Sequence, residues 1–276
     1  MQAKLKRLQQ ILKENGSCLI AFSGGVDSTF LLQAALKTLG PDQVLAVTAF
    51  SETYPERERQ AAVQLARQLG ARLLTVETEE LADPEFVANP IDRCYICKKE
   101  LWHKLQSIQQ QYQLQVIYDG ANADDASDFR PGRRATREAG VISPLLEAGL
   151  TKEEIRQLSR EWQLPTWNKP SFACLSSRFP YGSPITREKL LQIDAGENWL
   201  IEQGFLPCRV RHHGEIARLE LAPDQLARLV TDENLRQQCL EKFKSLGFTY
   251  ITLDLQGFRS GSMNENLSEE VKNGYK

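Results

Sequence analysis

The chain has 276 residues, of which 41% are hydrophobic, and this is enough for one large core or two modest ones. Its 34 basic and 36 acidic residues leave a net charge of −2, so the composition excludes a basic surface coat of the kind that binds nucleic acid. No apolar run approaches the roughly 20 residues of a transmembrane helix, and residues 1–16 predict an amphipathic helix rather than a signal peptide. We therefore expect a cytoplasmic protein with no membrane partner.

Residues 17–168 alternate between predicted strands and predicted helices. Short apolar runs predict the strands, and apolar residues at helical spacing predict the helices. In chain order these are a strand at 17–22, a helix at 26–40, a strand at 43–50, a helix at 55–70, a strand at 71–78, a helix at 93–112, a strand at 115–120 and a helix at 151–163, which opens with a capping box from Thr151 to Glu154. The alternation predicts an α/β fold, with a parallel sheet covered by helices on both faces, in a first domain at 1–168.

The pattern changes after about residue 180. It predicts a helix at 184–204, a strand, turn and strand over 207–221 with the turn at His213 and Gly214, helices at 223–230 and 232–246, and a last strand at 250–258. These elements predict a smaller α+β domain at 184–276. The stretch 169–183 is rich in Pro, Ser and Gly, as a linker would be, yet it carries Cys174 and Arg178.

The stretch AFSGGVDSTF lies between the first predicted strand and the helix that follows it. Gly24 and Gly25 allow backbone conformations that would let successive N–H groups point into one concavity, and the helix N-terminus adds positive potential. Ser23 and Ser28 can donate hydroxyl hydrogen bonds, and Asp27 can hold Mg²⁺. The alternative is an ordinary glycine turn. The loop lacks the Gly-Lys-Ser/Thr ending of a Walker A loop, which argues against γ-phosphate transfer.

This loop resembles the PP-loop of the ATP pyrophosphatases, which cradle the β,γ-pyrophosphate of ATP and transfer AMP to an oxygen of the substrate. The resemblance implies an adenylated intermediate, Mg²⁺, release of pyrophosphate and an ATP site formed by Ser23, Gly24, Gly25, Val26, Asp27 and Ser28. By position, Phe50, Ser51 and Gly120 stand at strand ends, so we expect them near the adenosine. The charged stretch 119–135 with Arg130, Arg133 and Arg134 is either solvated or supplies an arginine for the second substrate, and Arg133 is our candidate.

Four separated stretches, SGGVDS, GANADDASDFRPGRRA, KPSFACLSSRFPYG and LDLQGFRSGSMN, together resemble the LarE family of ATP-dependent sulfur transferases over nearly the whole chain. The resemblance implies adenylation of a carboxylate of a pyridinium dicarboxylate mononucleotide and its conversion to a thiocarboxylate for a nickel-pincer cofactor. It also implies a homo-oligomer that binds substrate through its smaller domain. Cys174 matches the linker cysteine that, in one branch of the family, gives up its own sulfur and becomes dehydroalanine. Cys174 and Asp27 are thus the expected catalytic residues.

The stretch DRCYICKKE adds two cysteines three positions apart, Cys94 and Cys97. With Cys174 they match a three-cysteine subgroup thought to hold a [4Fe-4S] cluster, on which an extra sulfide would be the sulfur donor. The spacing alone leaves other possibilities open: packed thiols, a zinc site completed by a ligand such as His103, or a disulfide that recharges Cys174. Cys18, Cys208 and Cys239 have no companion at ligand spacing and are predicted to be core or surface thiols.

The remaining substrate-binding candidates fall in stretches that match the family's site around the linker cysteine: Ser177, Arg178, Arg209, Arg211, Glu220 and Arg259. The fork of an arginine suits a nucleotide phosphate, although Arg209 and Arg211 alternate with Val210 and could simply face solvent. His212 and His213 are interpreted as part of a turn. A tRNA-thiolating PP-loop enzyme and a nucleotide-sensing module without chemistry are the competing functions. The near-neutral charge argues against the tRNA-thiolating enzyme. The presence of Asp27 in the phosphate loop together with Cys174 argues against the module without chemistry.

Overall fold

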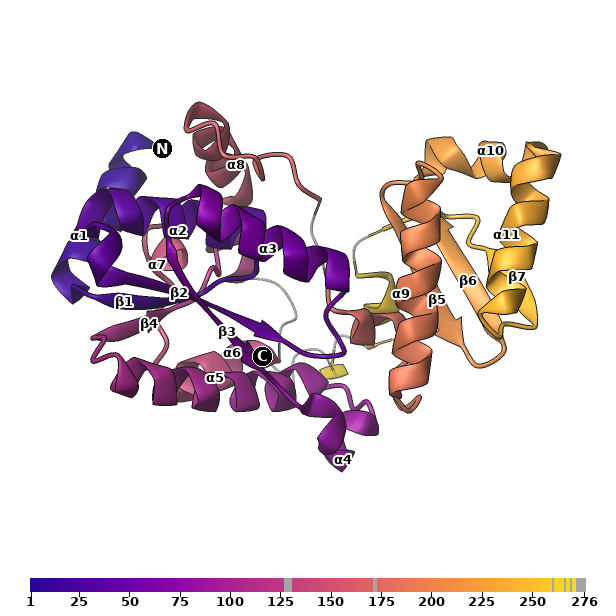
Figure 1. Ribbon diagram of the computed structural model, residues 1–276, viewed down its shortest axis with the longest axis horizontal. Helices are drawn as coiled ribbons and strands as arrows, with labels where there is room; N and C mark the ends of the chain where they lie inside the picture. The colour runs from indigo at the N-terminus through magenta and orange to yellow at the C-terminus, as the bar shows by residue number, and fades with distance from the viewer. Residues whose placement is uncertain (127–130, 171–172, 260, 266, 269, 272–276) are drawn as a thin grey trace. The chain divides into compact units, whose positions relative to one another are not determined.

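A computed structural model describes residues 1–126, 131–170, 173–259, 261–265, 267–268 and 270–271. The chain divides into two compact units (Figure 1). The first comprises Met1–Glu80 and the described residues of 92–172. The second comprises Leu81–Ile91 and the described residues of 173–271. Among the described residues, no helix combines the length and apolarity needed to cross a bilayer.

The first unit is built on a four-stranded parallel sheet, as the alternation of strands and helices predicted. Its strands are β1 (Cys18–Ala21), β2 (Val44–Phe50), β3 (Arg72–Glu77) and β4 (Val116–Tyr118), in the order β3-β2-β1-β4. The chain adds β2 and β3 on one side of β1 and then places β4 on its other side. Connections leaving β1 and β4 therefore diverge at the carboxyl ends of these strands, which is where open parallel sheets bind ligands.

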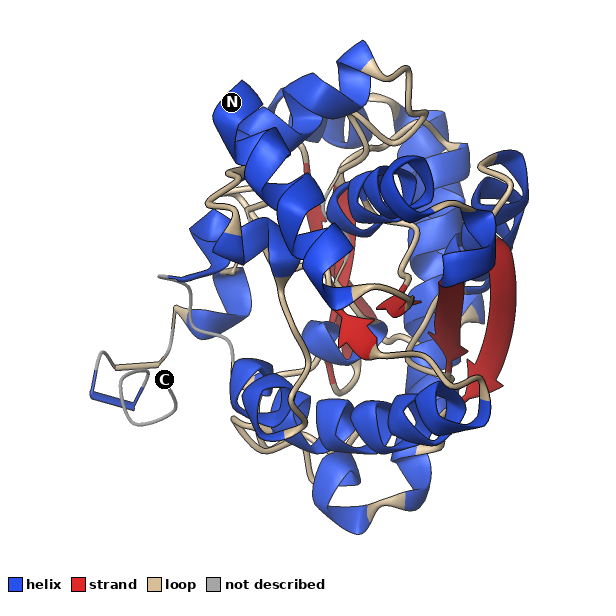
Figure 2. Ribbon diagram, turned by 90° about the vertical axis from the view of Figure 1, so that its left-hand side faces the viewer, coloured by secondary structure: helices blue, strands red, loops and turns tan. Residues whose placement is uncertain are grey.

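Helices cover both faces of this sheet because alternate strand residues point to opposite sides (Figures 1 and 2). Cys18 and Ile20 pack into one apolar core with residues of α1 (Gln2–Asn15), α2 (Val26–Leu39), α3 (Glu56–Gln68), α7 (Pro144–Glu147) and α8 (Lys152–Glu161). Leu19 packs into the other core with α5 (Arg93–Gln111) and α6 (Gly132–Glu138). The predicted capping box forms at the start of α8, where Thr151 and Glu154 bond each other's backbone N–H.

The second unit has a three-stranded sheet in the order β5-β6-β7. Strands β5 (Cys208–His213) and β6 (Ile216–Leu221) are antiparallel, and β7 (Tyr250–Leu253) pairs with β6 in parallel. Its helices are α4 (Pro84–Val87), α9 (Arg187–Glu202), α10 (Leu226–Thr231) and α11 (Glu233–Ser245). The last strand is shorter than predicted, because a turn begins at Asp254: its carbonyl accepts from Gly257 N, and Gly257 has a φ of 72°.

Residues 81–91 belong with the second unit, although sequence reasoning placed them in the first domain. Asn89 is fully buried and has a φ of 56°. Its side-chain amide donates to the carbonyls of Pro180 (2.8 Å) and Ser183 (3.1 Å), while its own carbonyl accepts from Gly182 N. These contacts join residues 81–91, which include the short helix α4, to the end of the linker. The sequence of residues 81–91 contains no local pattern that predicts these contacts.

Candidate functional site

The phosphate loop of the first unit connects β1 to α2 through Ser23, Gly24 and Gly25. Gly24 has a φ of 64°, and a Cβ there would lie 2.9 Å from Cβ of Ala62, so both the conformation and the close approach of α3 require glycine. Ser23 and Ser28 brace the loop: their hydroxyl oxygens lie 3.1 Å apart, and Ser28 Oγ donates to the carbonyl of Gly25. The loop is therefore fixed in shape where its N–H groups meet the start of α2.

Gly120, which follows β4 and was predicted to lie near the adenosine, lies against this loop. A Cβ at Gly120 would stand 3.1 Å from the backbone nitrogen of Ser28 and 3.4 Å from its Cα. The neighbouring Asp119 accepts from Ser143 Oγ at 2.6 Å, which holds the end of β4 in place. The carboxyl ends of β1 and β4 thus meet at the first turn of α2, at the point where the strand order of the sheet reverses.

Asp27 is the second residue of α2 and carries the one carboxylate of the loop motif. Its Oδ2 accepts from Lys152 Nζ at 2.6 Å, whereas its Oδ1 is buried and accepts no hydrogen bond from the described residues. A second ammonium reaches the loop from Lys169, which donates to the carbonyl of Gly24 (3.1 Å) and pairs with Glu58 (2.7 Å). A carboxylate oxygen of this kind, among hydroxyls and ammonium groups, fits a Mg²⁺ ion that arrives with a polyphosphate.

The end of β2 forms the next wall of the site. Phe50 is buried, and the guanidinium of Arg59 lies 4.5 Å from the centre of its ring. Ser51 Oγ lies 2.8 Å from Thr53 Oγ1. Tyr54 donates its hydroxyl to the carbonyl of Ser23 at 2.7 Å, and burial raises the pKa of this tyrosine above its usual range. The stretch after β2 is therefore tied to the phosphate loop, as the predicted adenosine site would need.

Cys94 and Cys97 lie in the first turns of α5, one turn apart and so on the same side of the helix. Cys94 is exposed and Cys97 is half-buried. Cys97 Sγ donates to Glu80 Oε1 at 3.4 Å, and the same oxygen accepts from Thr78 Oγ1. Two thiols near a helix N-terminus, where thiolates are favoured, are a donor set that fits iron or zinc. They are not packed core thiols, because one of them is exposed.

Among the residues that the structure describes, no three His, Cys, Asp or Glu side chains form a group that could hold a metal. Cys94 and Cys97 belong to the first unit and Cys174 to the second, so the three-cysteine site remains a prediction, as does its zinc alternative. Cys18, Cys208 and Cys239 are buried, as predicted for core thiols, and burial raises the pKa of Cys18 and of Cys239 to about 12.

In the second unit, Cys174 immediately precedes the short 3-10 helix η4 (Leu175–Arg178). The Cys174 carbonyl accepts from Ser177 Oγ at 2.8 Å and from Arg178 Nη1 at 3.1 Å, and the Ala173 carbonyl accepts from the same Nη1 at 2.8 Å. The guanidinium of Arg178 thus fixes the backbone on both sides of the cysteine.

Arg178 is itself held by a buried ion pair with Glu197 of α9. Its Nε and Nη2 donate to the two carboxylate oxygens at 2.8 and 2.9 Å, and both side chains are at most 1% exposed. Burial raises the pKa of Glu197, but the adjacent guanidinium outweighs that effect and keeps the pKa below its usual value. Glu197 also accepts from Val210 N, so one carboxylate joins η4, α9 and β5.

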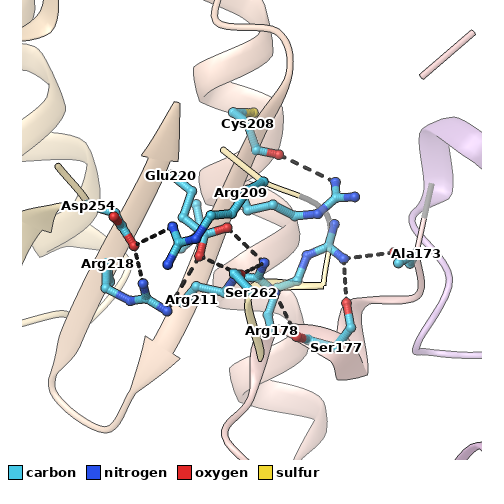
Figure 3. A network of polar contacts seen from close by, with 12 residues as sticks. Ala173, Ser177, Arg178, Cys208, Arg209, Arg211, Arg218, Glu220, Asp254 and Ser262 are labelled. Atoms are coloured by element: carbon cyan, nitrogen blue, oxygen red, sulfur yellow. Dashed lines mark hydrogen bonds and ion pairs between the residues drawn. The ribbon is translucent and has the colours of Figure 1, made fainter. Parts of the chain in front are cut away.

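Further arginines extend this site across β5 and β6 (Figure 3). Arg211 donates to the carbonyl of Ser177 (2.8 Å), to Glu220 (2.7 Å) and to Ser262 Oγ (2.7 Å). Arg218 forms a close ion pair with Asp254, which also accepts from Arg259 at 3.2 Å. Ser177, Arg178, Arg211 and Glu220, predicted from separate stretches, are thus joined in one hydrogen-bonded network, and Arg259 enters it through Asp254.

Arg209 and Arg211 do not simply face solvent, so that alternative for these two arginines is wrong. Arg211 is buried, and Arg209 lies over the ring of Phe258 at 5.0 Å, where burial and the charge of Arg178 lower its pKa to about 10. The turn interpretation was wrong for His212, which is a buried residue of β5. Its ring stacks on Phe179, and burial lowers its pKa to about 4. Both faces of β5 are covered because α9 and η4 pack against it.

The arginines of the charged stretch are placed differently from the others. Arg133 lies in α6 of the first unit, where its Nη1 donates to the carbonyl of Asp125 at 2.8 Å. Arg134 stacks on the ring of Tyr95 at 3.9 Å. Arg130 lies outside the described residues. Arg133 is therefore in a different unit from the other predicted substrate-binding residues.

Sequence reasoning missed several residues of the two sites. Glu197 had a signal: it occupies an apolar-stripe position of α9 with Leu190, Ile193 and Leu200, and a lone carboxylate there needs a buried partner. Lys152 had none, because a lysine at the start of a helix is ordinary. Asp254 and Ser262 lie in a stretch that was singled out, but their roles depend on neighbours distant in the chain.

The chain is similar to several known proteins. The family model described as NAD synthase matches residues 1–87. An uncharacterized protein of Synechocystis sp. is 42% identical over 269 residues, which cover 98% of this chain and 100% of that protein. The pyridinium-3,5-bisthiocarboxylic acid mononucleotide synthase of Lactiplantibacillus plantarum is 39% identical over 270 residues, covering 98% and 96%. An uncharacterized protein of Methanocaldococcus jannaschii is 29% identical over 260 residues, covering 93% and 98%.

Proposed function

The chain belongs to the family of pyridinium-3,5-bisthiocarboxylic acid mononucleotide synthases, the LarE family, and we propose that it transfers sulfur to a carboxylate of pyridinium-3,5-dicarboxylate mononucleotide after activating that carboxylate with ATP. One observation carries the proposal: the backbone around Cys174 is fixed by a buried arginine inside a cluster of further arginines. The linker cysteine and a cluster of arginines are thereby built into one unit.

Activation begins at the phosphate loop. A carboxylate oxygen of the substrate bonds to the α-phosphorus of ATP, the bond from that phosphorus to the bridging oxygen breaks, and pyrophosphate leaves with the electron pair. The N–H groups at the start of α2 and the hydroxyls of Ser23 and Ser28 would hold the phosphates. Asp27 would hold Mg²⁺ through its Oδ1, which has no hydrogen-bond partner among the described residues, and the ion would neutralise charge on the pyrophosphate.

The second unit suits the mononucleotide phosphate. Among the described residues, five arginines, 178, 209, 211, 218 and 259, gather in this unit around the carboxylates Glu197, Glu220, Asp254 and Glu265. Arg209 is a suited phosphate ligand, because it lies beside Phe258 and near the positive charge of Arg178. Arg178 has a different role in the proposal. It positions the linker, because its contacts run to Glu197 and to the backbone around Cys174.

Sulfur delivery is the second step of the proposal. Cys94, Cys97 and Cys174 would hold a [4Fe-4S] cluster, which when bound would supply a sulfide as the sulfur donor. The first turns of α5 place two of the thiols on one helix side, which supports this ligand set. The alternative within the same reaction makes Cys174 the donor. Its thiolate displaces AMP from the acyl carbon, loss of the Cα hydrogen and cleavage of the Cβ–S bond follow, and dehydroalanine remains.

We also propose, from the family resemblance, that the protein acts as a homo-oligomer with a small nucleotide as substrate and no nucleic-acid partner.

The decisive experiment measures pyrophosphate release from Mg·ATP by the full chain. We expect release to depend on pyridinium-3,5-dicarboxylate mononucleotide and to be absent with tRNA alone, with a thiocarboxylate as the product detected by mass spectrometry. Pyrophosphate release with tRNA and none with the mononucleotide would instead indicate that the chain is a tRNA-thiolating enzyme.

A further inference from the structure

Lys152, the first residue of α8, places its ammonium group on the carboxylate of the phosphate loop, with Nζ 2.6 Å from Oδ2 of Asp27. We propose that Lys152 binds the pyrophosphate end of ATP and stabilises pyrophosphate as it leaves. The inference rests on the ATP-dependent adenylation proposed above. It adds a substrate-binding residue that comes from outside the loop motif, 125 positions away in the chain.

The backbone of Lys152 is held firmly, so that only its side chain has freedom. Its N–H donates to Asp124 Oδ2 at 2.8 Å, in the 3-10 helix η3 (Ala123–Ala126). The capping box of Thr151 and Glu154 fixes the first turn of α8. A lysine on such a base has a four-carbon stem that can move its ammonium over several ångströms without disturbing the helix.

The charges at the loop explain why this ammonium would turn to phosphate. Asp27 has one oxygen paired with Lys152 and one buried oxygen without a hydrogen-bond donor among the described residues. Mg²⁺ bound to this carboxylate would place a double positive charge beside the ammonium and weaken the pair. Phosphate oxygens at the start of α2 would then be the nearest strong acceptors for Nζ. Lys152 thus exchanges one anion for another within the reach of its own side chain.

The reaction requires a positive charge at this place. When the substrate carboxylate bonds to the α-phosphorus, the bridging oxygen departs with the electron pair and carries new negative charge on pyrophosphate. An ammonium that donates to the departing oxygens stabilises that charge and keeps its own proton throughout. Lys169, the other ammonium at the loop, pairs with Glu58 and donates to the Gly24 carbonyl, so the inference does not extend to it.

The competing explanation is that Lys152 and Asp27 form only a structural ion pair between α8 and α2. Ligand binding separates the two explanations, because pyrophosphate carries the β- and γ-phosphates and AMP lacks both. A phosphate contact affects ATP and pyrophosphate selectively, whereas a structural pair affects the affinities for AMP and pyrophosphate together, or affects only the midpoint of unfolding.

The experiment uses the full chain and titration calorimetry with magnesium pyrophosphate and, separately, with AMP. Lys152→Met should weaken pyrophosphate binding roughly 10- to 100-fold, the usual effect of losing a hydrogen bond to a charged group, and leave AMP binding within about twofold. Lys152→Arg should restore most of the pyrophosphate affinity. Lys4→Met is the matched control, because it removes a lysine–carboxylate pair of similar length, 2.7 Å to Glu154 of α8, that lies away from the phosphate loop motif. It should alter neither affinity.

A second measurement needs no variant and covers the case in which Lys152→Met fails to fold. Wild-type protein is acetylated at low reagent concentration, and the modification of Lys152 is followed by peptide mass spectrometry. Magnesium pyrophosphate should slow acetylation of Lys152 severalfold, and AMP should not. Equal acetylation rates with and without pyrophosphate, or equal losses of AMP and pyrophosphate affinity in Lys152→Met, would overturn the inference. Both measurements omit the pyridinium substrate, so they can succeed or fail independently of the proposed sulfur transfer.

Discussion

Replacing Glu197 by Gln should destabilise the second unit strongly, because it removes the carboxylate that forms a buried ion pair with the guanidinium of Arg178. The carboxylate accepts two hydrogen bonds from Arg178, at 2.8 and 2.9 Å, and one from Val210 N at 3.0 Å. Gln has the same shape but one carbonyl oxygen, and its amide would direct N–H groups at an N–H donor. Breaking a buried ion pair on one side costs about 3–5 kcal/mol.

The measurement is urea unfolding followed by circular dichroism. With a denaturant dependence of about 2 kcal/mol/M, a loss of about 4 kcal/mol lowers the midpoint by about 2 M. The matched control is Glu265→Gln, which removes a carboxylate that also holds an arginine with two hydrogen bonds, to Arg259 at 2.6 and 2.9 Å, but on an exposed surface. Solvent screens that pair, so its midpoint should stay within experimental error of the wild type.

The pH dependence gives an independent check of the same pair. The folded pKa of Glu197 is lowered, so its contribution to stability is fully present above the ordinary value of about 4.5 and is lost as the pH falls through the lowered pKa. The difference between wild type and Glu197→Gln should stay constant from pH 7 to about pH 5 and narrow below it. Equal midpoints for the two Gln variants, or a difference that grows as the pH falls, would refute the reasoning.

Three further predictions concern the reaction. Asp27→Ala should abolish pyrophosphate release while the unfolding midpoint stays near that of the wild type; normal release from the folded variant would remove Asp27 from the magnesium site. Gly120→Val should weaken ATP binding at least tenfold in a calorimetric titration, because its branched side chain would be forced against the first turn of α2, 3.1 Å from where a Cβ would lie; unchanged affinity would contradict the close contact. Cys94→Ala or Cys97→Ala should each lose iron and visible absorbance after anaerobic purification, and wild-type Cys174 should keep its mass through repeated turnovers. Loss of the mass of hydrogen sulfide from Cys174 in iron-loaded protein would instead establish the sacrificial route.

Much of the first unit was predictable because its determinants are local. The run of apolar residues at 43–50 and the Pro and Gly that bound 55–70 predict β2 and α3 within two residues, and the capping box predicts the first turn of α8. The phosphate loop was predictable for the same reason: Gly24, Gly25 and Asp27 are neighbours in the chain, and a strand–loop–helix context gives them one geometry.

The partners of these residues could not be predicted from the sequence, because they depend on contacts between distant segments. Lys152 meets Asp27 across 125 positions, and Arg178 meets Glu197 across two elements that each look ordinary alone. Arg211 and His212 are neighbours on β5, and both are buried. An alternation of apolar and polar residues does not predict that two adjacent polar residues of a strand are both buried. Such contacts depend on which element covers which face of a strand.

The sequence by itself determined the parallel sheet, the place of the phosphate loop and the family, because local patterning and four ordered motifs suffice for these. Only the tertiary structure decided which contacts the side chains of these motifs make. It shows that Arg178 holds the backbone of Cys174 and that Arg211 lies buried between Glu220 and Ser262. The physical reason is that burying an arginine requires acceptors at fixed positions, and the chain supplies them from segments that only the folded unit brings together.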